Sequence, residues 1–472
     1  MNKDPHRATR RGFLKGAGLA GLATPLLAGS ASAMAAKKTP SAKAKNLIFM
    51  VADGMCNGTL ALAHHWHLRQ KQERLHWMQL YDRSDLHRAF QDTASNSSPV
   101  TDSAAAASAW GSGKRVNNGS INIDAEGRTL TPIYVRAKQS GKRTGLVSTC
   151  RISHATPAGF VANVKDRDEE DEIVRQYLAR EIDLLLGGGA RHFLQTGKGG
   201  MGEASADYFR KFAAAGYRIV RNREQLKGFS ASGEPVLGVF SDSHIPYAID
   251  RKNDASLRSI PGLREMFAAA LKQLNTSPEG FLLQVEAGRV DHAGHANDPA
   301  AILHELLEFD RCIPLALDYI QNHPDTLLIV TTDHGTGGCQ LNGQGERYGD
   351  SGPALDRMQQ FTRSFEWLER RFKASSRFDA AAFRMATGFD ASEAQAAAIQ
   401  SAIGNPEVKY LSSHMTGILE AELGALSATG WSSNNHTSEN VELLAFGPGA
   451  GQLPAYLRNF ELNGLVCDAL GI

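Results

Sequence analysis

The sequence predicts an α/β protein in which a central, mainly parallel sheet lies between helices and a mostly helical segment is inserted. Three observations lead to this fold class. Short apolar runs alternate with helix-like stretches along most of the chain. The runs are continuously apolar, as in strands that are covered by helices on both faces. Polar and ionisable residues follow several runs, and in an open parallel sheet this rim is where ligands bind.

Six runs are expected to form the strands of this sheet. In chain order they are Asn46–Ala52, Thr144–Thr149, Asp183–Leu186, Phe281–Ala287, Thr326–Thr332 and Val441–Phe446. With 472 residues, of which 42% are hydrophobic, the chain is long enough to bury a substantial core around such a sheet. We expect one main domain over residues 46–472, with a helical insertion at about 341–429.

The predicted helices carry recognisable start and stop signals. Asp298 and Pro299 make a favourable N-cap and first-turn pair, and Pro314 is expected to kink or end the helix that they begin. Asp390 with Glu393 is expected to cap a later helix that is rich in Ala and Gln.

The insertion differs in composition from the rest of the chain, since it is rich in Ala, Arg, Gln and Phe. It contains an apolar stripe that consists of Phe361, Phe365, Leu368 and Phe372. The spacing is that of one helix face. Because such a stripe is packing more often than a ligand site, we interpret it as part of a core.

The first 35 residues are expected to be a cleaved twin-arginine export signal. Arg10 and Arg11 precede a stretch rich in Gly, Ala and Leu, and small residues suited to cleavage follow at Ala31–Ala35. The alternatives are a chance basic N-terminus or a membrane anchor, but the apolar run is short, broken by Gly and without a stop-transfer pattern. We expect a linker over residues 36–45 and a periplasmic or secreted protein with no membrane anchor after cleavage.

Charge and cysteine content argue against several other classes. Residues 1–35 hold five basic residues and one acid, so cleavage would lower the net charge from +1 to −3. Basic stripes with interleaved aromatics are absent from the sequence, so we expect no specific nucleic-acid binding. The five cysteines are odd in number and irregularly spaced, and Cys-x-x-Cys does not occur. We therefore expect neither a disulfide framework nor a thiolate zinc site.

Candidate metal ligands occur around the run that begins at Phe281. Glu286 lies inside this apolar run, where burial of a carboxylate is costly unless a cation compensates it. Asp291, His292 and His295 follow, and carboxylates and imidazoles suit zinc or magnesium. A solvated polar loop would explain Asp291 and His292 but not Glu286, so we favour a metal site.

Similar residues lie at three other predicted strands. Asp53 follows the first run, although alone it indicates no more than a turn. Asp333 and His334 follow the fifth run and would also fit a buried hydrogen-bonded dyad. His436 precedes the last run, and a lone histidine is usually structural. Together, three aspartates, one glutamate and three histidines at successive strand ends provide ligands for more than one metal.

Ser103 is a candidate nucleophile. It stands before Ala104–Ala107, a strong helix-forming stretch, so it is expected at a helix N-terminus. A simple N-cap serine is the alternative. Free backbone N–H groups and the helix dipole favour an anion at this position, and a nearby metal would lower the pKa of the hydroxyl.

The segment from Val100 to Ser108 closely resembles the active-serine signature of the alkaline phosphatase family. Further segments resemble this family in the same order: Lys114 with Asn118-Gly119, Val147-Ser148-Thr149, His154-Ala155-Thr156-Pro157-Ala158, Leu186-Gly187-Gly188-Gly189, Phe240-Ser241-Asp242-Ser243-His244, Val285-Glu286-Ala287-Gly288, Asp333-His334-Gly335 and His436-Thr437. The resemblance extends from about Asn46 to Gly449 and weakens in the insertion. It implies an alkaline-phosphatase-like sandwich, hydrolysis of small phosphate monoesters, and a homodimer such as family members often form.

The resemblance also implies a site with two zinc ions and a third ion, usually magnesium. Asp291, His295 and His436 would bind the first zinc, and Asp53, Asp333 and His334 would bind the second. Asp53, Thr156 and Glu286 would serve the magnesium site, with Asp102, His154 and His292 around these ligands. Arg167 resembles the arginine that clamps phosphate, although its charged surroundings also fit a solvated surface arginine.

Three departures from the family pattern are present. Ser108 stands where the signature usually has Thr, which is a conservative change. His154 and His292 stand where some bacterial members have Asp and Lys, while many others have His. An imidazole in place of the carboxylate would weaken Mg²⁺ binding and admit zinc, so the third ion is the one that the resemblance defines least. Many familiar members are exported unfolded, whereas a twin-arginine signal implies folding before export.

The implied reaction is an in-line displacement in which Ser103 attacks phosphorus and the phosphoserine is then hydrolysed. Two rivals remain. The first is a related sulfatase or phosphodiesterase of the same superfamily. A sulfatase would need Cys-x-Pro-x-Arg, and the best match, Cys312-Ile313-Pro314-Leu315-Ala316, lacks the arginine. A phosphodiesterase would usually lack the clamp and the third metal. A catalytically dead protein that binds metal or phosphate is the other rival, and the full set of candidate ligands argues against it.

Overall fold

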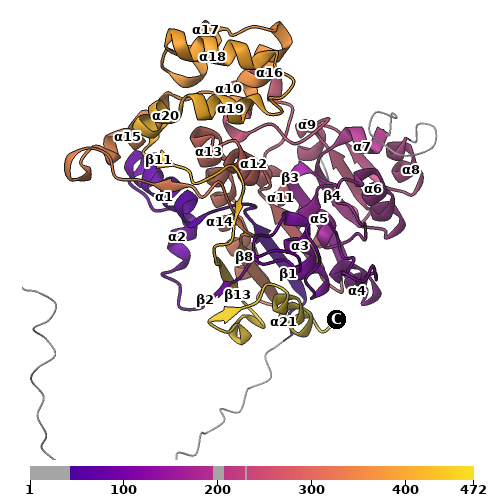
Figure 1. Cartoon of the computed structure of the whole chain (residues 1–472). Helices are drawn as coiled ribbons and strands as arrows, with labels where there is room; N and C mark the ends of the chain where they lie inside the picture. The colour runs from indigo at the N-terminus through magenta and orange to yellow at the C-terminus, as the bar shows by residue number, and fades with distance from the viewer. Residues whose placement is uncertain (1–42, 195–206, 229–230) are drawn as a thin grey trace, which may run out of the picture. The chain divides into compact units, whose positions relative to one another are not determined.

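The computed structural model describes residues 43–194, 207–228 and 231–472 (Figure 1). Within these residues, the main sheet has ten strands in the order β14-β2-β13-β8-β1-β7-β3-β4-β6-β5. They are β1 (Asn46–Val51), β2 (His87–Gln91), β3 (Arg143–Arg151), β4 (Leu184–Gly188), β5 (Arg218–Val220), β6 (Val236–Val239), β7 (Phe281–Glu286), β8 (Thr326–Thr331), β13 (Val441–Phe446) and β14 (Tyr456–Leu457). The prediction that the six apolar runs are strands is confirmed.

Helices connect the strands and cover both faces of the sheet. In chain order they are α1 (Asn57–Lys71), α2 (His76–Leu80), α3 (Ser103–Ser112), α4 (Ile133–Gln139), α5 (Ala155–Gly159), α6 (Glu170–Ala179), α7 (Ala190–Leu194), α8 (Tyr208–Ala214), α9 (Arg223–Lys227), α10 (Ala248–Asn253), α11 (Leu263–Leu274), α12 (Arg289–His295), α13 (Pro299–Asp310), α14 (Ile313–Asn322), α15 (Ser351–Arg357), α16 (Phe365–Ser375), α17 (Ala380–Thr387), α18 (Glu393–Ile403), α19 (Leu411–Ile418), α20 (Glu420–Ser427) and α21 (Glu461–Leu470). The predicted α/β class with a mainly parallel sheet is confirmed.

Strand β1 shows why the runs are continuously apolar. It lies between β7 and β8 and is parallel to both. Ile48 and Met50 belong to the core that includes residues of α11 and α13, while Leu47 and Phe49 belong to the core that includes residues of α3 and α21. Every residue of the strand is therefore buried, and burial of a large apolar side chain contributes roughly 1.5–3 kcal/mol.

Strand β13 runs against the other strands of the sheet. It pairs antiparallel with β8 and β2, whereas the remaining pairs are parallel. Its start therefore lies at the edge where the parallel strands end. The short strand β12 (His436–Thr437) precedes it and pairs with β9 (Gly335–Thr336), which follows β8. This reversal brings His436 to the carboxyl ends of β1, β7 and β8.

Four strands of the sheet are not predicted from the sequence, namely β2, β5, β6 and β14. Strands β5 and β14 contain three and two residues, which is too short for a periodic pattern. Strand β2 has the sequence HRAFQ, in which polar residues outnumber apolar ones. Its pairing with β13 and β14 comes from tertiary contacts that a local pattern does not contain.

The stretch from Leu341 to Thr429 is mostly helical. Strands β10 (Gln340–Leu341) and β11 (Thr429–Gly430) pair its two ends, and α15 to α20 lie between them. Figure 1 shows α16, α17, α18 and α19 as an orange group at the top of the view. All four residues of the predicted apolar stripe are buried, with at most 4% of the residue exposed. The interpretation of the stripe as packing is confirmed.

Helix α13 starts as its sequence predicts. The Asp298 side chain accepts hydrogen bonds from the N–H groups of Ala300 and Ala301, and Pro299 is the first helical residue. The helix ends at Asp310, and Pro314 lies in the first turn of α14. The proline thus begins a second helix, where its missing N–H is tolerated.

The predicted cap of α18 is wrong by two residues. The helix is capped by Ser392, and the side chain of Gln395 completes a capping box. Asp390 with Glu393 and Ser392 with Gln395 have the same spacing and similar chemistry. Local sequence cannot separate the two, and Asp390 instead pairs with Arg384.

Two buried carboxylates attach the start of α16 to the rest of the fold. Asp250 accepts from the N–H of Ser364 at 2.8 Å and from its hydroxyl at 2.6 Å. Asp298 accepts from the N–H of Phe365 at 2.8 Å. Carboxylates are favourable at a helix N-terminus because its N–H groups have no partner within the helix. The helical stretch is thereby fixed beside the loop that follows α12.

The predicted export signal falls within residues 1–42 and lies outside the described residues. In the described parts of the chain, no helix combines the length and the apolar character that a bilayer crossing requires. All five cysteines are buried and free.

Candidate metal centre

The predicted ligands meet at one edge of the main sheet. Asp53 follows β1, Glu286 ends β7, Asp333 follows β8, and His436 opens β12. Because β1, β7 and β8 are adjacent and parallel, their carboxyl ends lie side by side. The strand order therefore brings together residues that are up to several hundred positions apart in the chain.

The first ligand set consists of Asp291, His295 and His436. Asp291 and His295 are four residues apart on α12 and share one face of the helix. The Nε2 atoms of His295 and His436 lie 3.0 Å apart, and Asp291 Oδ1 lies 3.4 Å from each of them. Three ligand atoms thus converge on one point.

Hydrogen bonds at the outer ring nitrogens orient this set. His295 Nδ1 donates to the carbonyl of Asn434 at 2.6 Å, and His436 Nδ1 donates to the carbonyl of Thr101 at 2.7 Å. A carbonyl oxygen only accepts, so each Nδ1 carries a proton and Nε2 is the nitrogen that faces Asp291. Two nitrogen atoms and a carboxylate oxygen this close need a positive charge between them, which a proton or a metal ion supplies.

The second ligand set consists of Asp53, Asp333 and His334. His334 Nε2 lies 3.0 Å from Asp333 Oδ2 and 3.7 Å from Asp53 Oδ1. All three residues are buried, and one ligand atom from each lies within 4.8 Å of the others. Asp53 Oδ1 has no hydrogen-bond partner, which is unusual for a buried carboxylate oxygen. Two carboxylates and an imidazole form a donor set that suits zinc.

Thr336 joins the two ligand sets. Its hydroxyl donates to Asp291 Oδ1 at 2.6 Å and lies 3.3 Å from His334 Nδ1. The residue is in β9, which pairs with the strand that carries His436. Thr336 is not among the residues predicted from the sequence, because nothing in its local sequence marks a threonine as a bridge between ligands.

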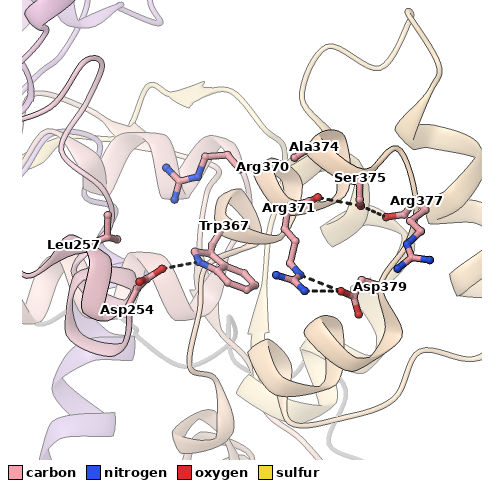
Figure 2. Close-up of a pocket in the computed structure, with 9 residues that line it drawn as sticks. All are labelled: Asp254, Leu257, Trp367, Arg370, Arg371, Ala374, Ser375, Arg377 and Asp379. Atoms are coloured by element: carbon pink, nitrogen blue, oxygen red, sulfur yellow. Dashed lines mark hydrogen bonds and ion pairs between the residues drawn. The ribbon is translucent and has the colours of Figure 1, made fainter.

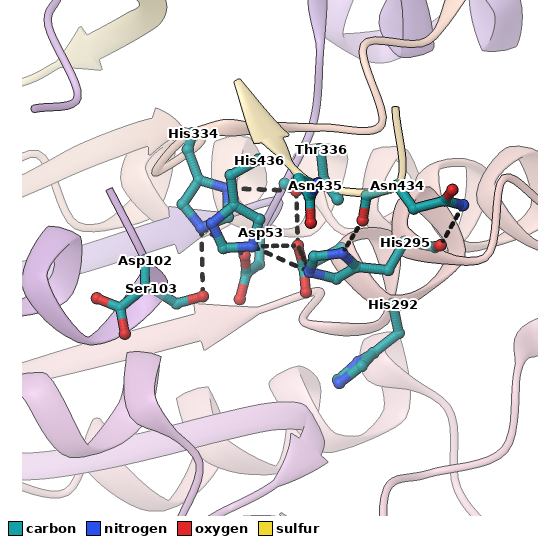
Figure 3. A network of polar contacts seen from close by, with 12 residues as sticks. Asp53, Asp102, Ser103, His292, His295, His334, Thr336, Asn434, Asn435 and His436 are labelled. Atoms are coloured by element: carbon teal, nitrogen blue, oxygen red, sulfur yellow. Dashed lines mark hydrogen bonds and ion pairs between the residues drawn. The ribbon is translucent and has the colours of Figure 1, made fainter. Parts of the chain in front are cut away.

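Ser103 begins helix α3 and faces the second set. Its Oγ lies 3.2 Å from His334 Nε2, and the residue is 1% exposed. The helix is capped by Asp102, which accepts from the N–H of Ala105 at 2.9 Å. The predicted helix N-terminus is confirmed, and the capping role belongs to Asp102 rather than to the serine. Figure 3 shows Ser103, His334 and His436 turned toward one another.

A third group of oxygen atoms lies next to the second set. Thr156 donates its hydroxyl proton to Asp53 Oδ2 at 3.2 Å. Glu286 is completely buried, and its Oε2 accepts a hydrogen bond from Ser148. Its Oε1 has no hydrogen-bond partner. Hydroxyl and carboxylate oxygens can hold a hard divalent cation.

Arg167 lies beside the serine and is not a solvated surface arginine. Its side chain is only 21% exposed. Nη1 donates to Asp102 Oδ2 at 3.0 Å, and Nη2 lies 3.2 Å from His154 Nε2. A guanidinium in this position can present two N–H groups to an anion at Ser103.

Burial and mutual repulsion dominate the electrostatics of these residues. Burial raises the pKa of Asp53 well above that of an ordinary aspartate, and the neighbouring carboxylates raise it further. Burial also raises the pKa of Glu286 to about 7. Burial lowers the pKa of His436, but the hydrogen bond and charge of Asp291 outweigh this effect and raise it to about 9. In the absence of a divalent cation, bound protons reduce the repulsion between the carboxylates.

His292 is not part of either set. It follows Asp291 directly, so it points from a different face of α12, and Figure 3 shows it apart from the other histidines. Its Nδ1 lies 3.5 Å from the Sγ of Cys150. His154 and His244 are close to it, with ring centroids 5.5 and 4.3 Å away.

Two cavities differ in their relation to this region. One of about 490 Å³ is lined by Asn434, Trp431 and residues of α19 and α20, and so it borders the first ligand set through Asn434. Another of about 600 Å³ lies along α16 and contains no predicted ligand (Figure 2). Within it, Arg371 forms an ion pair with Asp379, and Trp367 donates to Asp254.

Comparison with known proteins gives consistent results. Residues 44–471 match the family model described as alkaline phosphatase. Alkaline phosphatase 3 of Bacillus subtilis is 29% identical over 465 residues, which cover 93% of this chain and 92% of the relative. The crystal structure of Thermus thermophilus alkaline phosphatase has a TM-score of 0.81 and 35% identity over 95% of this chain and 96% of that one. A cold-active alkaline phosphatase from Shewanella sp. has a TM-score of 0.74 and 29% identity, covering 90% and 99%.

A buried serine beside converging carboxylates and imidazoles, at the rim of an α/β sheet, defines a hydrolase of the metal-assisted class. The match over nearly the whole described chain makes the assignment more specific. The chain belongs to the alkaline phosphatase family. It is a phosphoric monoester hydrolase.

Proposed function

We propose that this enzyme acts through a phosphoserine at Ser103, with one zinc ion in each of the two ligand sets and a third ion beside Glu286. The observation that supports this best is the first ligand set, in which two Nε2 atoms and a carboxylate oxygen lie 3.0–3.4 Å apart. A positive charge between these atoms makes the arrangement favourable, and a divalent cation can replace the proton that supplies this charge in its absence. The second set places the same chemistry next to the Ser103 hydroxyl.

Ser103 is the proposed nucleophile. Its Oγ forms a bond to phosphorus while the bond from phosphorus to the ester oxygen breaks, and its proton passes to solvent. Water then attacks the phosphoserine and releases phosphate. The start of α3 offers unpaired N–H groups to the phosphate. When bound, the divalent cations lower the pKa of the hydroxyl and offset charge on the attacking and leaving oxygens.

Arg167 is the proposed phosphate clamp. Asp102, the residue before Ser103, holds its Nη1 in place, so the planar guanidinium would lose little side-chain entropy on binding phosphate. Two parallel N–H donors match two phosphate oxygens. The alcohol part of the substrate would then face the 490 Å³ cavity beyond His295, whose lining is partly polar.

The rival functions lack comparable support. Cys312, at the best sulfatase-like sequence, is completely buried between α13 and α14 and contacts the carbonyl of Glu308. A phosphodiesterase would not need Arg167 beside the nucleophile. A catalytically dead binder would have no reason to keep a serine within 3.2 Å of His334.

A serine substitution tests the proposal. Ser103→Ala should reduce phosphate release from an aryl phosphate to background while zinc content stays at the wild-type level, because no ligand is removed. Zinc is measured by elemental mass spectrometry, and Ser112→Ala, at the other end of α3, serves as the matched control. Normal turnover by Ser103→Ala would contradict the proposal, as would equal turnover of the wild type with and without a chelator.

We further propose that residues 1–35 direct export to the periplasm or the medium and that the enzyme forms a homodimer. Cell fractionation of the full chain and of a variant with Arg10→Lys and Arg11→Lys tests the first statement, and analytical ultracentrifugation tests the second. Retention of activity in the cytoplasm by the wild type, or sedimentation as a monomer, would contradict the respective statement.

A further inference from the structure

A thiol lies among the atoms of the third ligand group. Cys150 is a completely buried residue near the end of β3. Its Sγ, one oxygen of Glu286 and one ring nitrogen of His154 lie within 4.8 Å of one another. The spacing of cysteines in the sequence argued against a thiolate site, but the fold assembles one cysteine with ligands from two other elements.

Two members of this group have buried polar atoms that lack partners. Glu286 Oε1 and His154 Nδ1 make no hydrogen bond in the structure. Glu286 is completely buried, and His154 is 9% exposed. Unpaired buried polar atoms are rare because each costs about 1–3 kcal/mol. Both residues belong to the group that contains Cys150 Sγ, so a cation held by this group could give each of these atoms a partner.

The position of Gly288 points to the same space. This residue precedes α12 and has ordinary helical torsion angles, φ −70° and ψ −16°. A Cβ atom at this position would lie 2.6 Å from both Cys150 Sγ and Glu286 Oε1. The conformation does not require glycine, so the absence of a side chain matters because it leaves room for these two atoms.

A neighbouring combination of Cys150, His244 and His292 is a weaker candidate. Both ring nitrogens of His244 already face Arg151, at 3.3 Å from its backbone nitrogen and 2.6 Å from Nη1. A cation there would compete with the guanidinium. His292 is better suited to a supporting role, because its Nδ1 lies 3.5 Å from the sulfur and can donate to a thiolate.

We propose that Cys150 is a thiolate ligand at the third metal position and that this position therefore selects zinc over magnesium. The inference rests on the proposed function, because it deepens the assignment of the third ion. Thiolate and imidazole are soft or borderline ligands that favour Zn²⁺, whereas Mg²⁺ requires oxygen ligands in an octahedral arrangement. On binding, the thiol loses its proton to solvent and the sulfur lone pair coordinates the ion.

Metal competition and cobalt spectroscopy test the proposal. The wild type, Cys150→Ser, Gly288→Ala and the control Cys467→Ser are stripped with a chelator and dialysed against equal concentrations of Zn²⁺ and Mg²⁺. We expect three zinc ions per chain in the wild type and the control. We expect two zinc ions and one magnesium ion in Cys150→Ser, and two zinc ions in Gly288→Ala, where the methyl group fills the space.

Cobalt spectroscopy gives a reading that does not depend on activity. The wild-type spectrum, moreover, does not depend on the folding of a variant. Stripped wild-type protein loaded with Co²⁺ should show a thiolate-to-cobalt charge-transfer band in the near ultraviolet, and Cys150→Ser should lack it. Two zinc ions and one magnesium ion in the wild type, with no such band, would overturn the proposal and leave the two-zinc assignment intact. Failure of the wild type to bind any zinc would instead overturn the proposed function.

Discussion

Individual hydrogen bonds decide which atoms of the site face inward. His295 and His436 each give their Nδ1 proton to a backbone carbonyl, and Thr336 donates to Asp291. These contacts orient the ligand atoms before an ion arrives, which lowers the entropic cost of binding. Substitution of Thr336 should therefore disturb the arrangement of the proposed ligands, as substitution of a ligand itself would.

The clamp assigned to Arg167 gives a prediction at the scale of one residue. Arg167→Ala should weaken phosphate binding by about 10–100-fold, because a charged hydrogen-bonded contact contributes about 1.5–3 kcal/mol. Arg167→Lys should recover only part of the affinity, since a lysine has no planar pair of donors. Inhibition constants for inorganic phosphate measure this effect.

Arg175→Ala is the matched control, because this arginine pairs with Glu172 on the exposed side of α6. Its inhibition constant should equal that of the wild type. An unchanged inhibition constant for Arg167→Ala would show that the guanidinium does not touch phosphate.

The sequence indicated the carboxylates and histidines that meet at the site, but not the residues that contact them. Asp53, Asp333 and Glu286 were found because they follow or interrupt apolar runs, and a carboxylate in such a position is costly without a cation. Thr336 and Cys150 have no such signal, since a threonine or a cysteine fits any buried strand. Their roles depend on distances between elements, which a local pattern does not contain.

Close packing of two helices positions the serine. A Cβ at Gly111 of α3 would lie 1.9 Å from the carbonyl oxygen of Gly159 in α5. Helix α3 carries Ser103, and α5 carries Thr156. The glycine therefore allows the two elements to approach closely enough for both side chains to reach the same site.

Gly111→Ala should destabilise the enzyme by roughly 1–3 kcal/mol, because the added methyl group forces α3 away from α5. It should also lower turnover, since Ser103 moves with the helix. Gly464→Ala in α21 is the matched control: its added methyl meets nothing within 4 Å, so helix propensity predicts a gain of about 0.5–1 kcal/mol. Urea unfolding measures both, and equal stability of the two variants would contradict this explanation.

At the level of elements, the prediction succeeded where strands are long and buried on both faces. It failed for β2, β5, β6 and β14, and it did not anticipate that β13 is antiparallel. Direction within a sheet is set by the connections and by pairing with β8 and β2. This direction matters for the site, because a parallel β13 would place His436 at the opposite edge.

For the whole molecule, the proposed metal sites predict that metal binding and folding are coupled through buried carboxylates. Between the ordinary glutamate pKa of 4.5 and about 7, Glu286 keeps its proton in the folded metal-free protein and loses it in the unfolded chain. The unfolded chain then binds fewer protons, so stability falls as the pH rises through this window. The loss should be on the order of 3 kcal/mol, at about 1.4 kcal/mol per pH unit.

Urea unfolding of chelator-treated and zinc-loaded protein at about pH 5 and about pH 7.5 measures this loss. The zinc-loaded protein should not show it, since ions replace the proton. Glu305, whose pKa burial also raises to about 7, contributes equally to both samples. A parallel pH dependence of the two samples would contradict the coupling.

The central claim is that seven side chains from four parts of the sheet rim converge around divalent cations beside Ser103. Anomalous diffraction at the zinc absorption edge, from crystals of the zinc-loaded enzyme, tests it most directly. The account predicts one zinc peak between Asp291, His295 and His436 and another between Asp53, Asp333 and His334. Full zinc loading in solution with no peak at either position would contradict it.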